Sequence, residues 1–271
     1  MRSYLSHFSL ALAGSLMALS LAACGQGISA EPDAAPLPTS SVAASTPQQV
    51  ASSSAPPSSS ASAESAAPSQ AATRRPADIE SASSMTVLVN KHNPLSPLTY
   101  APDDLQPLGS VLLRAEAAEA AHRMFAHASA AGAPMVALSG YRSYETQQGT
   151  YASWAAQYGT DQADVASARP GYSEHQTGLA LDIGTGGACD LQPCFKDTAA
   201  ALWAAENAHR YGFVVRYPWW HHETTGYWYE SWHLRYIGVD EATALKESGF
   251  ETLEDFWGTG PAPSYRNGFQ P

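Results

Sequence analysis

Apolar residues recur every three or four positions after Leu112, and this period predicts a helix over about 112–130. The repeat is carried by Leu113, Ala117, Ala120, Met124 and Ala128. Further helices are expected where capping and turn residues bound longer segments, namely 144–158, 161–168, 197–211 and 240–247.

Short β-rich runs lie between these helices and predict strands over 86–90, 135–138 and 213–217. The segment 179–183 alternates, so its apolar residues share one face while Asp182 lies on the other. A second alternating run covers 232–237, and Glu230 is expected in the turn before it. Asp182 therefore leaves its strand away from the apolar face, where a metal ligand can lie without being buried unpaired.

The first 23 residues have the pattern of an export signal. Arg2 precedes an apolar run from Phe8 to Ala23, which is shorter than the roughly 20 apolar residues that cross a bilayer. The run ends in Leu-Ala-Ala-Cys-Gly at 21–25, which resembles the lipobox of bacterial lipoproteins. We therefore expect lipidation of Cys24, so that the protein is anchored to the membrane without spanning it. An ordinary cleaved signal that ends near a cysteine is the alternative.

Residues 24–85 consist almost entirely of Ala, Ser, Pro, Thr and Gln, with few large apolar side chains. Such a segment buries too little surface to offset the entropy of ordering, so it predicts a disordered tether. About 60 residues of this kind reach roughly 40–45 Å. We expect an exported protein whose domain lies at the outer face of the cytoplasmic membrane, in the cell wall.

The remaining chain divides into one domain over 86–257 and a C-terminal tail over 258–271. The net charge of −11 argues against nucleic acid or an anionic membrane surface as a partner, so contact with the membrane is expected only through Cys24. We expect a monomer.

Two cysteines remain besides Cys24. Cys189 and Cys194 lie five residues apart in a segment containing Gly and Pro, and in an exported protein such a pair is typical of a disulfide. A zinc site made by the two thiols is the alternative, but the spacing differs from Cys-x-x-Cys and no second pair exists.

The candidate chemistry lies in two stretches, 171–183 and 230–233. They supply His175, Asp182 and His233, and two imidazoles with one carboxylate form a three-ligand zinc site with an open fourth position. Glu230 then remains available for proton transfer. The alternative for the second stretch is that His233 is a hydrogen-bonded histidine and Glu230 a surface residue, neither with a role in metal binding or catalysis.

Other histidines fit this chemistry less well. His122 and His127 are five residues apart on the predicted helix, do not share a face and are expected at the surface. The stretch from His222 to Gly226 fails the zinc-binding pattern His-Glu-x-x-His, because Gly226 stands where the second ligand is needed. His221 and His222 are therefore expected in an exposed loop.

Arg142 follows the predicted strand over 135–138, a position from which a side chain projects into a cleft. A guanidinium can bind a carboxylate through two parallel hydrogen bonds. The alternative is a surface arginine paired with a nearby acid.

These stretches resemble the VanY-type D-alanyl-D-alanine carboxypeptidases. The likeness rests on Ser-x-His-x-x-Gly-x-x-x-Asp at 173–182 and Glu-x-x-His at 230–233, with supporting motifs at 139–143 and 212–218. It implies an α+β fold, shared with D-Ala-D-Ala dipeptidases and hedgehog domains, in which a small antiparallel sheet carries one zinc ion and helices pack against it.

The resemblance also implies roles for single residues. It assigns zinc binding to His175, Asp182 and His233, and it makes Glu230 the catalytic base. It makes Arg142 a residue that binds substrate or stabilises the transition state, and it places Ser173 and either Gln147 or Gln148 along the substrate cleft.

The activity implied is removal of the terminal D-Ala from peptidoglycan stem peptides ending in D-Ala-D-Ala. A D,D-dipeptidase, a cell-wall endopeptidase and a non-catalytic zinc-stabilised peptidoglycan-binding module remain as alternatives, and the presence of Glu230 argues against the last. One departure is visible, because Ser231 stands where family members usually carry Pro, which loosens the turn expected to hold Glu230.

Overall fold

A four-stranded antiparallel sheet lies at the centre of the computed structural model, which describes residues 76–266. Its strand order is β3 (Val136–Ser139), β4 (Ala180–Gly184), β6 (Glu230–Tyr236) and β5 (Phe213–Tyr217). The sheet is small and helices pack against it, so the expected α+β fold is confirmed. The predicted export signal, Cys24 and most of the predicted tether lie outside the described residues.

The register of the two central strands positions the candidate site. Asp182 on β4 lies opposite His233 on β6, and on its other side it pairs with Ser139 of β3. Directly opposed residues in an antiparallel pair project from the same face of the sheet. The backbone pairing alone therefore brings two of the three proposed ligands together.

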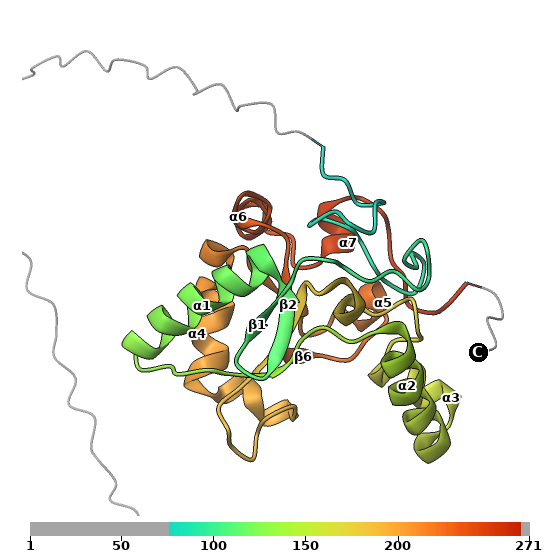
Figure 1. Ribbon diagram of the computed structural model, residues 1–271, viewed down its shortest axis with the longest axis horizontal. Coiled ribbons are helices and arrows are strands. Elements are labelled where there is room, and N and C mark those ends of the chain that lie inside the picture. Colours follow the sequence, from blue (N-terminus) through green and yellow to red (C-terminus); the bar gives the residue numbers. More distant parts are fainter. Residues whose placement is uncertain (1–75, 267–271) are drawn as a thin grey trace, which may run out of the picture. The chain divides into compact units, whose positions relative to one another are not determined.

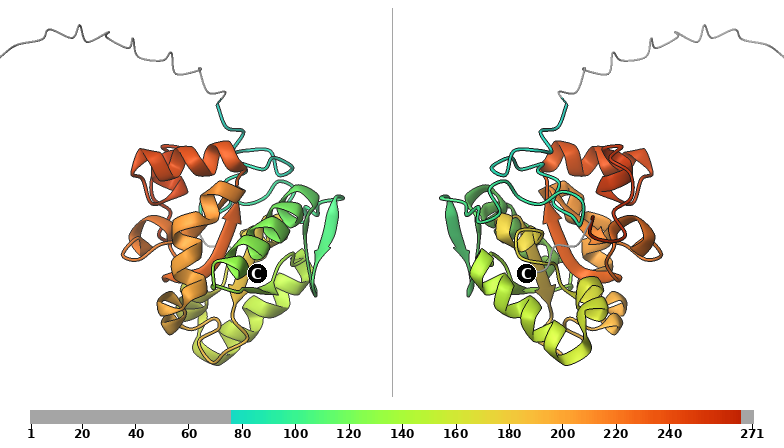
Figure 2. Two further views of the ribbon diagram at one scale, coloured as in Figure 1. Left: turned by 90° about the vertical axis from the view of Figure 1, so that its left-hand side faces the viewer. Right: turned by 90° about the vertical axis from the view of Figure 1, so that its right-hand side faces the viewer.

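Helices α1 (Ala115–Ala130) and α4 (Ala199–Asn207) lie over one face of this sheet (Figure 2). Their alanine-rich faces allow close approach to apolar side chains of the two central strands, namely Leu179, Leu181, Ile183, Leu234 and Tyr236. Figure 1 shows α2 (Tyr144–Tyr158) and α3 (Thr160–Ala166) together in a separate lobe of the domain.

The remaining elements are short. A hairpin of β1 (Leu105–Leu108) and β2 (Val111–Arg114) precedes α1, and three 3₁₀ turns cover Glu174–Thr177, Pro193–Asp197 and Ala208–Tyr211. The last helices are α5 (His222–Thr225), α6 (Val239–Ser248) and α7 (Leu253–Phe256). A second, smaller apolar cluster joins α6 and α7 to β5.

Several predicted elements were wrong in detail. Residues 86–90 form no strand but only an isolated bridge between Asn90 and Asn93, because no neighbouring strand pairs with them. The helix expected from 112 begins at Ala115, since Val111–Arg114 pairs with the preceding strand. The segment 197–211 is helical from Ala199 to Tyr211, but it changes from an α-helix to a 3₁₀ turn at Ala208. A short helix replaces the loop expected after His221.

The strand β6 also begins earlier than expected. Glu230 is its first residue and pairs with Tyr217 of β5, so it is not in a preceding turn.

The domain extends beyond its expected boundaries of 86 and 257. Ala82 and Ala262 are buried, and Ile79 contacts the smaller apolar cluster. The buried Lys91 joins the two ends, because its ammonium donates to the carbonyls of Gly226 and Pro263. Residues from Ile79 onward and residues as far as Pro263 therefore pack with the domain.

The disulfide between Cys189 and Cys194 is confirmed, which excludes a zinc site made by the two thiols. Among residues 76–266, none of the helices is long and apolar enough to cross a membrane.

Replacing both cysteines by serine should lower the free energy of unfolding by about 2 kcal/mol, because the bond closes only a short loop. Chemical denaturation of the variant and of wild type, each with and without reductant, measures the effect. Reductant should destabilise the wild type by a similar amount and leave the variant unchanged. Equal stability of oxidised wild type and variant would contradict the prediction.

Candidate metal centre and active site

Three buried side chains converge on the face of the sheet opposite α1 and α4. His175 comes from the 3₁₀ turn Glu174–Thr177, Asp182 from β4 and His233 from β6. One potential ligand atom of each lies within 4.8 Å of the other two, which is close enough for a single cation to contact all three. The structure therefore brings together the three residues expected to bind zinc.

Hydrogen bonds orient both imidazoles toward Asp182. Nδ1 of His175 lies 2.7 Å from the carbonyl oxygen of Gly140 and must donate, because a carbonyl only accepts. Nε2 of His233 lies 3.2 Å from Oε2 of Glu174. The remaining nitrogens, Nε2 of His175 and Nδ1 of His233, lie 3.3 and 3.2 Å from the Asp182 carboxylate. Histidine ligands of metals are commonly held in this way through their second nitrogen.

The donor set fits a zinc ion. Oδ1 of Asp182 is buried and has no hydrogen-bond partner among the described residues, although buried polar atoms are normally paired. Burial opposes ionisation of Asp182, but His175 and His233 hold the pKa of its carboxyl well below its usual range. Burial also lowers the pKa of His175, which favours the neutral imidazole that a metal requires. Two imidazoles and one carboxylate are a ligand set of hydrolytic zinc sites.

His233 differs from His175 in its protonation. Burial acts to lower its pKa, but contacts with Asp182 and Glu174 and the charge of Glu230 raise that pKa to about 9 in the metal-free site. A metal ion that binds Nδ1 must therefore displace a proton near neutral pH.

Glu230 lies beside the three residues without joining them. Its Oε2 is 3.7 Å from Nδ1 of His233, and its side chain is 17% exposed. Burial raises the pKa of Glu230 to about 7, Asp182 acts in the same direction, and His233 opposes both. A carboxyl group with a pKa near the working pH can both accept and return a proton.

Arg142 lies across the same cleft and is held from behind. Its Nη1 donates to Oε1 of Gln147 at 2.8 Å, and its Nη2 donates to Oγ of Ser139 at 3.2 Å. Gln147 was expected along the cleft, but it is buried and does not line it, because its amide also donates to Ala168. Its place behind Arg142 makes it a positioning residue.

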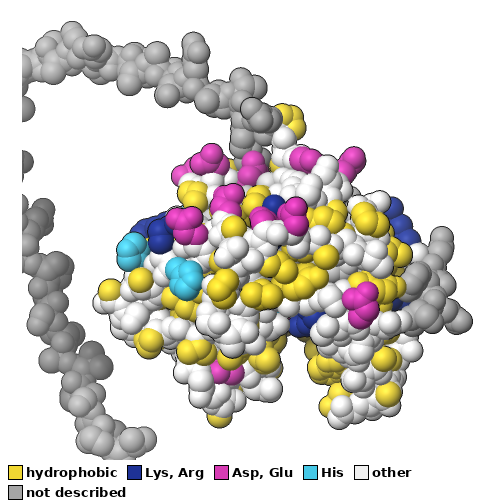
Figure 3. All heavy atoms as spheres, viewed as in Figure 1, with side chains coloured by type: hydrophobic (Ala, Val, Ile, Leu, Met, Phe, Trp, Pro, Cys, Tyr) yellow, Lys and Arg dark blue, Asp and Glu magenta, His cyan; other side chains and the backbone are white. Residues whose placement is uncertain are grey.

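The cleft has a volume of about 210 Å³ and is lined by Arg142, Ser173, His175, Asp182, Glu230 and His233, together with aromatic side chains. Ser173 therefore lies where it was expected. Figure 3 shows the surface hollowed between the lobe of α2 and α3 and the rest of the domain, with basic side-chain atoms at the inner end.

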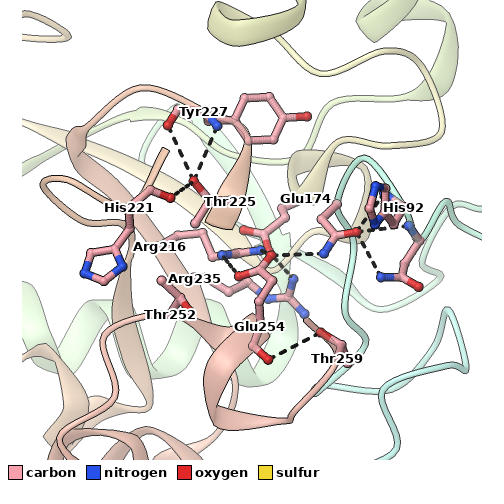
Figure 4. Close-up of polar contacts among 12 residues, drawn as sticks. His92, Glu174, Arg216, His221, Thr225, Tyr227, Arg235, Thr252, Glu254 and Thr259 are labelled. Carbon is pink, nitrogen blue, oxygen red and sulfur yellow. Dashed lines mark hydrogen bonds and ion pairs between the residues drawn. The ribbon is translucent and has the colours of Figure 1, made fainter. Parts of the chain in front are cut away.

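A buried network of charges contacts His233 through Glu174 and was not foreseen. Figure 4 shows its members Glu174, Arg216, Arg235 and Glu254. Oε1 of Glu174 accepts hydrogen bonds from Arg216 at 2.8 Å and from Arg235 at 2.9 Å. Arg216 also binds Glu254 of α7 through two hydrogen bonds of 2.7 and 2.9 Å. All four side chains are fully buried. Burial opposes ionisation of Glu174, yet the two guanidinium groups hold the pKa of its carboxyl well below its usual range.

A partial signal for this network exists in the sequence. Arg216 and Arg235 each stand inside an otherwise apolar β-rich run, where a charge is unusual unless it is paired. Nothing in the sequence around Glu254 distinguishes it from the other acidic residues of 247–255.

The other histidines lie outside the cluster. His122, His127 and His222 are exposed, as expected, and the partly buried His221 contacts Glu251.

Comparison with known proteins places these residues in a family context. The family model described as "VanY: D-alanyl-D-alanine carboxypeptidase" matches residues 110–239. The putative carboxypeptidase YodJ of Bacillus subtilis is 37% identical over 190 residues, which cover 66% of this chain and 69% of that protein.

Two solved structures are also similar. One is the LD-carboxypeptidase LdcB, with a TM-score of 0.59 and 38% identity, covering 64% of this chain and 86% of that one. The other is a mutant of the vancomycin resistance D,D-pentapeptidase VanY in complex with Zn(II), with a TM-score of 0.56 and 32% identity. It covers 63% of this chain and 97% of that one.

The link between Glu174 and His233 predicts a separable effect on metal binding. Glu174→Gln removes the charge that orients His233, and loss of such an outer partner lowers metal affinity by about 10–100-fold. Both substitutions break buried ion pairs, each at a cost of about 3–5 kcal/mol of stability, but Glu254→Gln leaves the contact between Glu174 and His233 intact. Zinc affinity by chelator competition, together with denaturation, distinguishes the two. Wild-type zinc affinity in Glu174→Gln would contradict the assigned role.

The raised pKa of His233 predicts that zinc binding depends on pH. Near pH 8 the metal-free imidazole is protonated, so binding should release about one proton per zinc ion. Affinity should then fall by up to about tenfold per unit as the pH drops below about 9, where protons compete with the metal.

Zinc titration of chelator-stripped protein in weak buffer with a pH dye measures the proton release. His222→Ala, which alters an exposed imidazole outside the cluster, serves as the control. Zinc binding without proton release would show that His233 is already neutral.

Proposed function

The chain belongs to the VanY family of D-alanyl-D-alanine carboxypeptidases, and from this premise we propose that it is a zinc-dependent peptidase that removes the terminal D-Ala from peptidoglycan stem peptides. Its membership makes it a carboxypeptidase, a hydrolase. The observation that carries the finer proposal is the convergence of His175, Asp182 and His233 in a cleft that also contains Glu230 and Arg142.

One zinc ion per chain would be held by Nε2 of His175, the carboxylate of Asp182 and Nδ1 of His233. The solved VanY relative contains Zn(II), and in this chain the buried Oδ1 of Asp182, which accepts no hydrogen bond although Nδ1 of His233 lies 3.2 Å away, suits a cation. Bound zinc supplies Lewis-acid chemistry, because it polarises a carbonyl group and makes water more acidic.

Glu230 handles the proton in this proposal. Its carboxylate takes a proton from the attacking water and then delivers that proton to the nitrogen of the departing D-Ala. The pKa of about 7 suits both steps, since the carboxylate exists near neutral pH and its conjugate acid is strong enough to protonate the amine.

Arg142 binds the terminal carboxylate of the substrate. Gln147 and Ser139 hold the guanidinium from behind, so it is fixed before the peptide arrives. A fixed guanidinium gives a short, charge-assisted anchor, and this anchor selects the end of a peptide over an internal bond. Ser173, at the wall of the cleft, contacts the substrate beside it.

The protein acts outside the cytoplasmic membrane, as a monomer anchored by a lipid on Cys24 and carried by the tether that follows. The apolar run before Cys24 supports export, and the disulfide supports an oxidising compartment.

An L,D-carboxypeptidase is the second candidate, because LdcB, at 38% identity and a TM-score of 0.59, is more similar to this chain than the VanY structure is, at 32% and 0.56. Such an enzyme takes D-Ala from a tetrapeptide, where the preceding residue has the L configuration. A dipeptidase or endopeptidase would use the same chemistry on another bond.

Two synthetic stem peptides distinguish these activities. The pentapeptide ending in D-Ala-D-Ala should lose one alanine residue, as followed by mass, and the tetrapeptide ending in a single D-Ala should stay intact. Loss of a dipeptide would indicate a dipeptidase, and an internal cut would indicate an endopeptidase. Cleavage of the tetrapeptide alone would indicate an L,D-carboxypeptidase. Each of these results would contradict the proposed activity. Chelation should abolish cleavage, and added zinc should restore it.

Glu230→Gln should separate catalysis from metal binding. The amide keeps the shape of the side chain and cannot accept a proton, so turnover of the pentapeptide should fall by at least about 10²–10⁴-fold. Zinc content should stay near that of wild type, because the three proposed ligands are intact.

His233→Ala is the matched comparison for this prediction. It should lose zinc and activity together, since two protein ligands rarely hold a catalytic zinc ion. Zinc per chain and turnover are measured for both variants. Full activity of Glu230→Gln, or loss of its zinc, would show that Glu230 has a different role.

A further inference from the structure

A groove with a volume of about 500 Å³ continues from the active-site cleft across the surface. The two share Trp154, Ala166, Leu191, Glu230 and Trp232, so a ligand in the cleft reaches the groove without leaving the protein surface. We call it the tryptophan groove, after the side chains that dominate it, which are Trp154, Trp219, Trp220, Trp228 and Trp232.

These rings are unusually open to solvent. Trp220 is 77% exposed and Trp228 is 52% exposed, although a tryptophan normally buries most of its large apolar surface. An apolar surface left open beside a catalytic cleft is typical of a binding site.

The backbone holds the groove in place at an energetic cost. Trp220 has a φ of 68° and Leu191 a φ of 56°, and they are the non-glycine residues with positive φ in the described part of the chain. Both line the groove. Large side chains avoid this region, and such conformations persist where the surrounding structure imposes them, often at functional sites.

Neighbouring contacts make the groove rigid. The ring of Trp219 meets the edges of Trp220 and Tyr229, with ring centres 5.4 and 4.8 Å away. Leu191 lies inside the loop closed by the Cys189–Cys194 disulfide. A site that is already ordered loses little entropy when it binds a ligand.

The chemistry of the lining selects the ligand. Among the described residues that form the groove, none is Lys, Arg or Asp; the exposed His222 lies at the groove, and the one carboxylate, Glu230, belongs to the catalytic cleft. The groove therefore suits a neutral molecule with flat C–H faces for the indole rings and polar edges that stay in water. Pyranose rings have this form, because their C–H faces pack on indole rings while their hydroxyl groups stay hydrated.

The glycan to which the stem peptide is attached consists of pyranose rings, and these lie close enough to the cleft to contact the tryptophan groove. A stem peptide of five residues spans at most about 17 Å when extended, so the sugar at its other end stays close to the cleft. We propose that the tryptophan groove binds N-acetylated hexosamine rings of the glycan that bears the stem peptide. This inference rests on the proposed function, because it names the part of that substrate which lies outside the cleft.

The test compares two substrates that share one peptide. Zinc-loaded wild-type protein is given the free stem pentapeptide and the same peptide attached to its disaccharide. The disaccharide form should have the lower KM, with a similar kcat for both. Trp220→Ala should raise KM for the disaccharide form by about five- to tenfold and leave the free peptide within about twofold.

Phe250→Ala is the matched control. Phe250 is 52% exposed and lies outside the groove, so its loss removes a similar exposed ring and should change neither substrate. Because the Trp220 ring makes few contacts with the core, Trp220→Ala should unfold at the same temperature as wild type.

A second measurement does not depend on catalysis. A peptide-free tetramer of N-acetylglucosamine should quench the tryptophan fluorescence of wild type and of Phe250→Ala, and this effect should be lost in Trp220→Ala. If neither substrate is cleaved but the tetramer binds, the proposed function fails while the sugar site stands.

Three outcomes would overturn the sugar site and leave the proposed function intact. They are equal KM values for the two substrates in wild type, an equal loss on both substrates in Trp220→Ala, and the absence of tetramer binding. Dimerisation at high concentration that disappears in Trp220→Ala would assign the groove to a second copy of the chain instead.

Discussion

The buried carboxylate of Glu174 joins the sheet to the candidate metal centre. Removing an ion from water costs several kcal/mol, so a charge at this depth persists only with close partners. Arg216 on β5 and Arg235 on β6 supply them, and His233 takes the second oxygen. Two strands and a 3₁₀ turn are thereby held at fixed distances, and the orientation of one proposed zinc ligand follows from that arrangement.

The turn that carries Glu174 also carries His175. One local conformation therefore directs Glu174 toward the buried arginines and His175 toward Asp182. The turn ends at Gly178, whose φ of 69° lies in the left-handed region. A Cβ at this position would meet Arg114 and Leu105 at 3.0 Å, so a side chain would push the turn away from the β1–β2 hairpin. A glycine that does not line the cleft thus helps to fix the turn that carries His175.

The strands and residues that bear the chemistry could be predicted, while the network behind them could not. Alternation around Asp182 and His233 indicated paired strands, and the family resemblance indicated which side chains meet. The role of Glu174 was not predicted, because the sequence next to a metal ligand does not show whether a glutamate is buried in an ion pair or exposed to solvent. Its role depends on contacts with residues about 40 to 60 positions away. The strand expected over 86–90 failed for the converse reason, since local β preference forms no strand without a partner.

The helix α7 supplies one member of the buried charge network, Glu254. Glu254 on α7 neutralises Arg216 and accepts a hydrogen bond from Asn90, so a residue near the C-terminus links parts that were synthesised much earlier. Contacts of such long sequence separation form late and slow the folding of a chain. Without α7, Arg216 and Arg235 would share the single carboxylate of Glu174. Folding of this domain is therefore completed only when α7 is available to pack against it, because Arg216 then has its full set of partners.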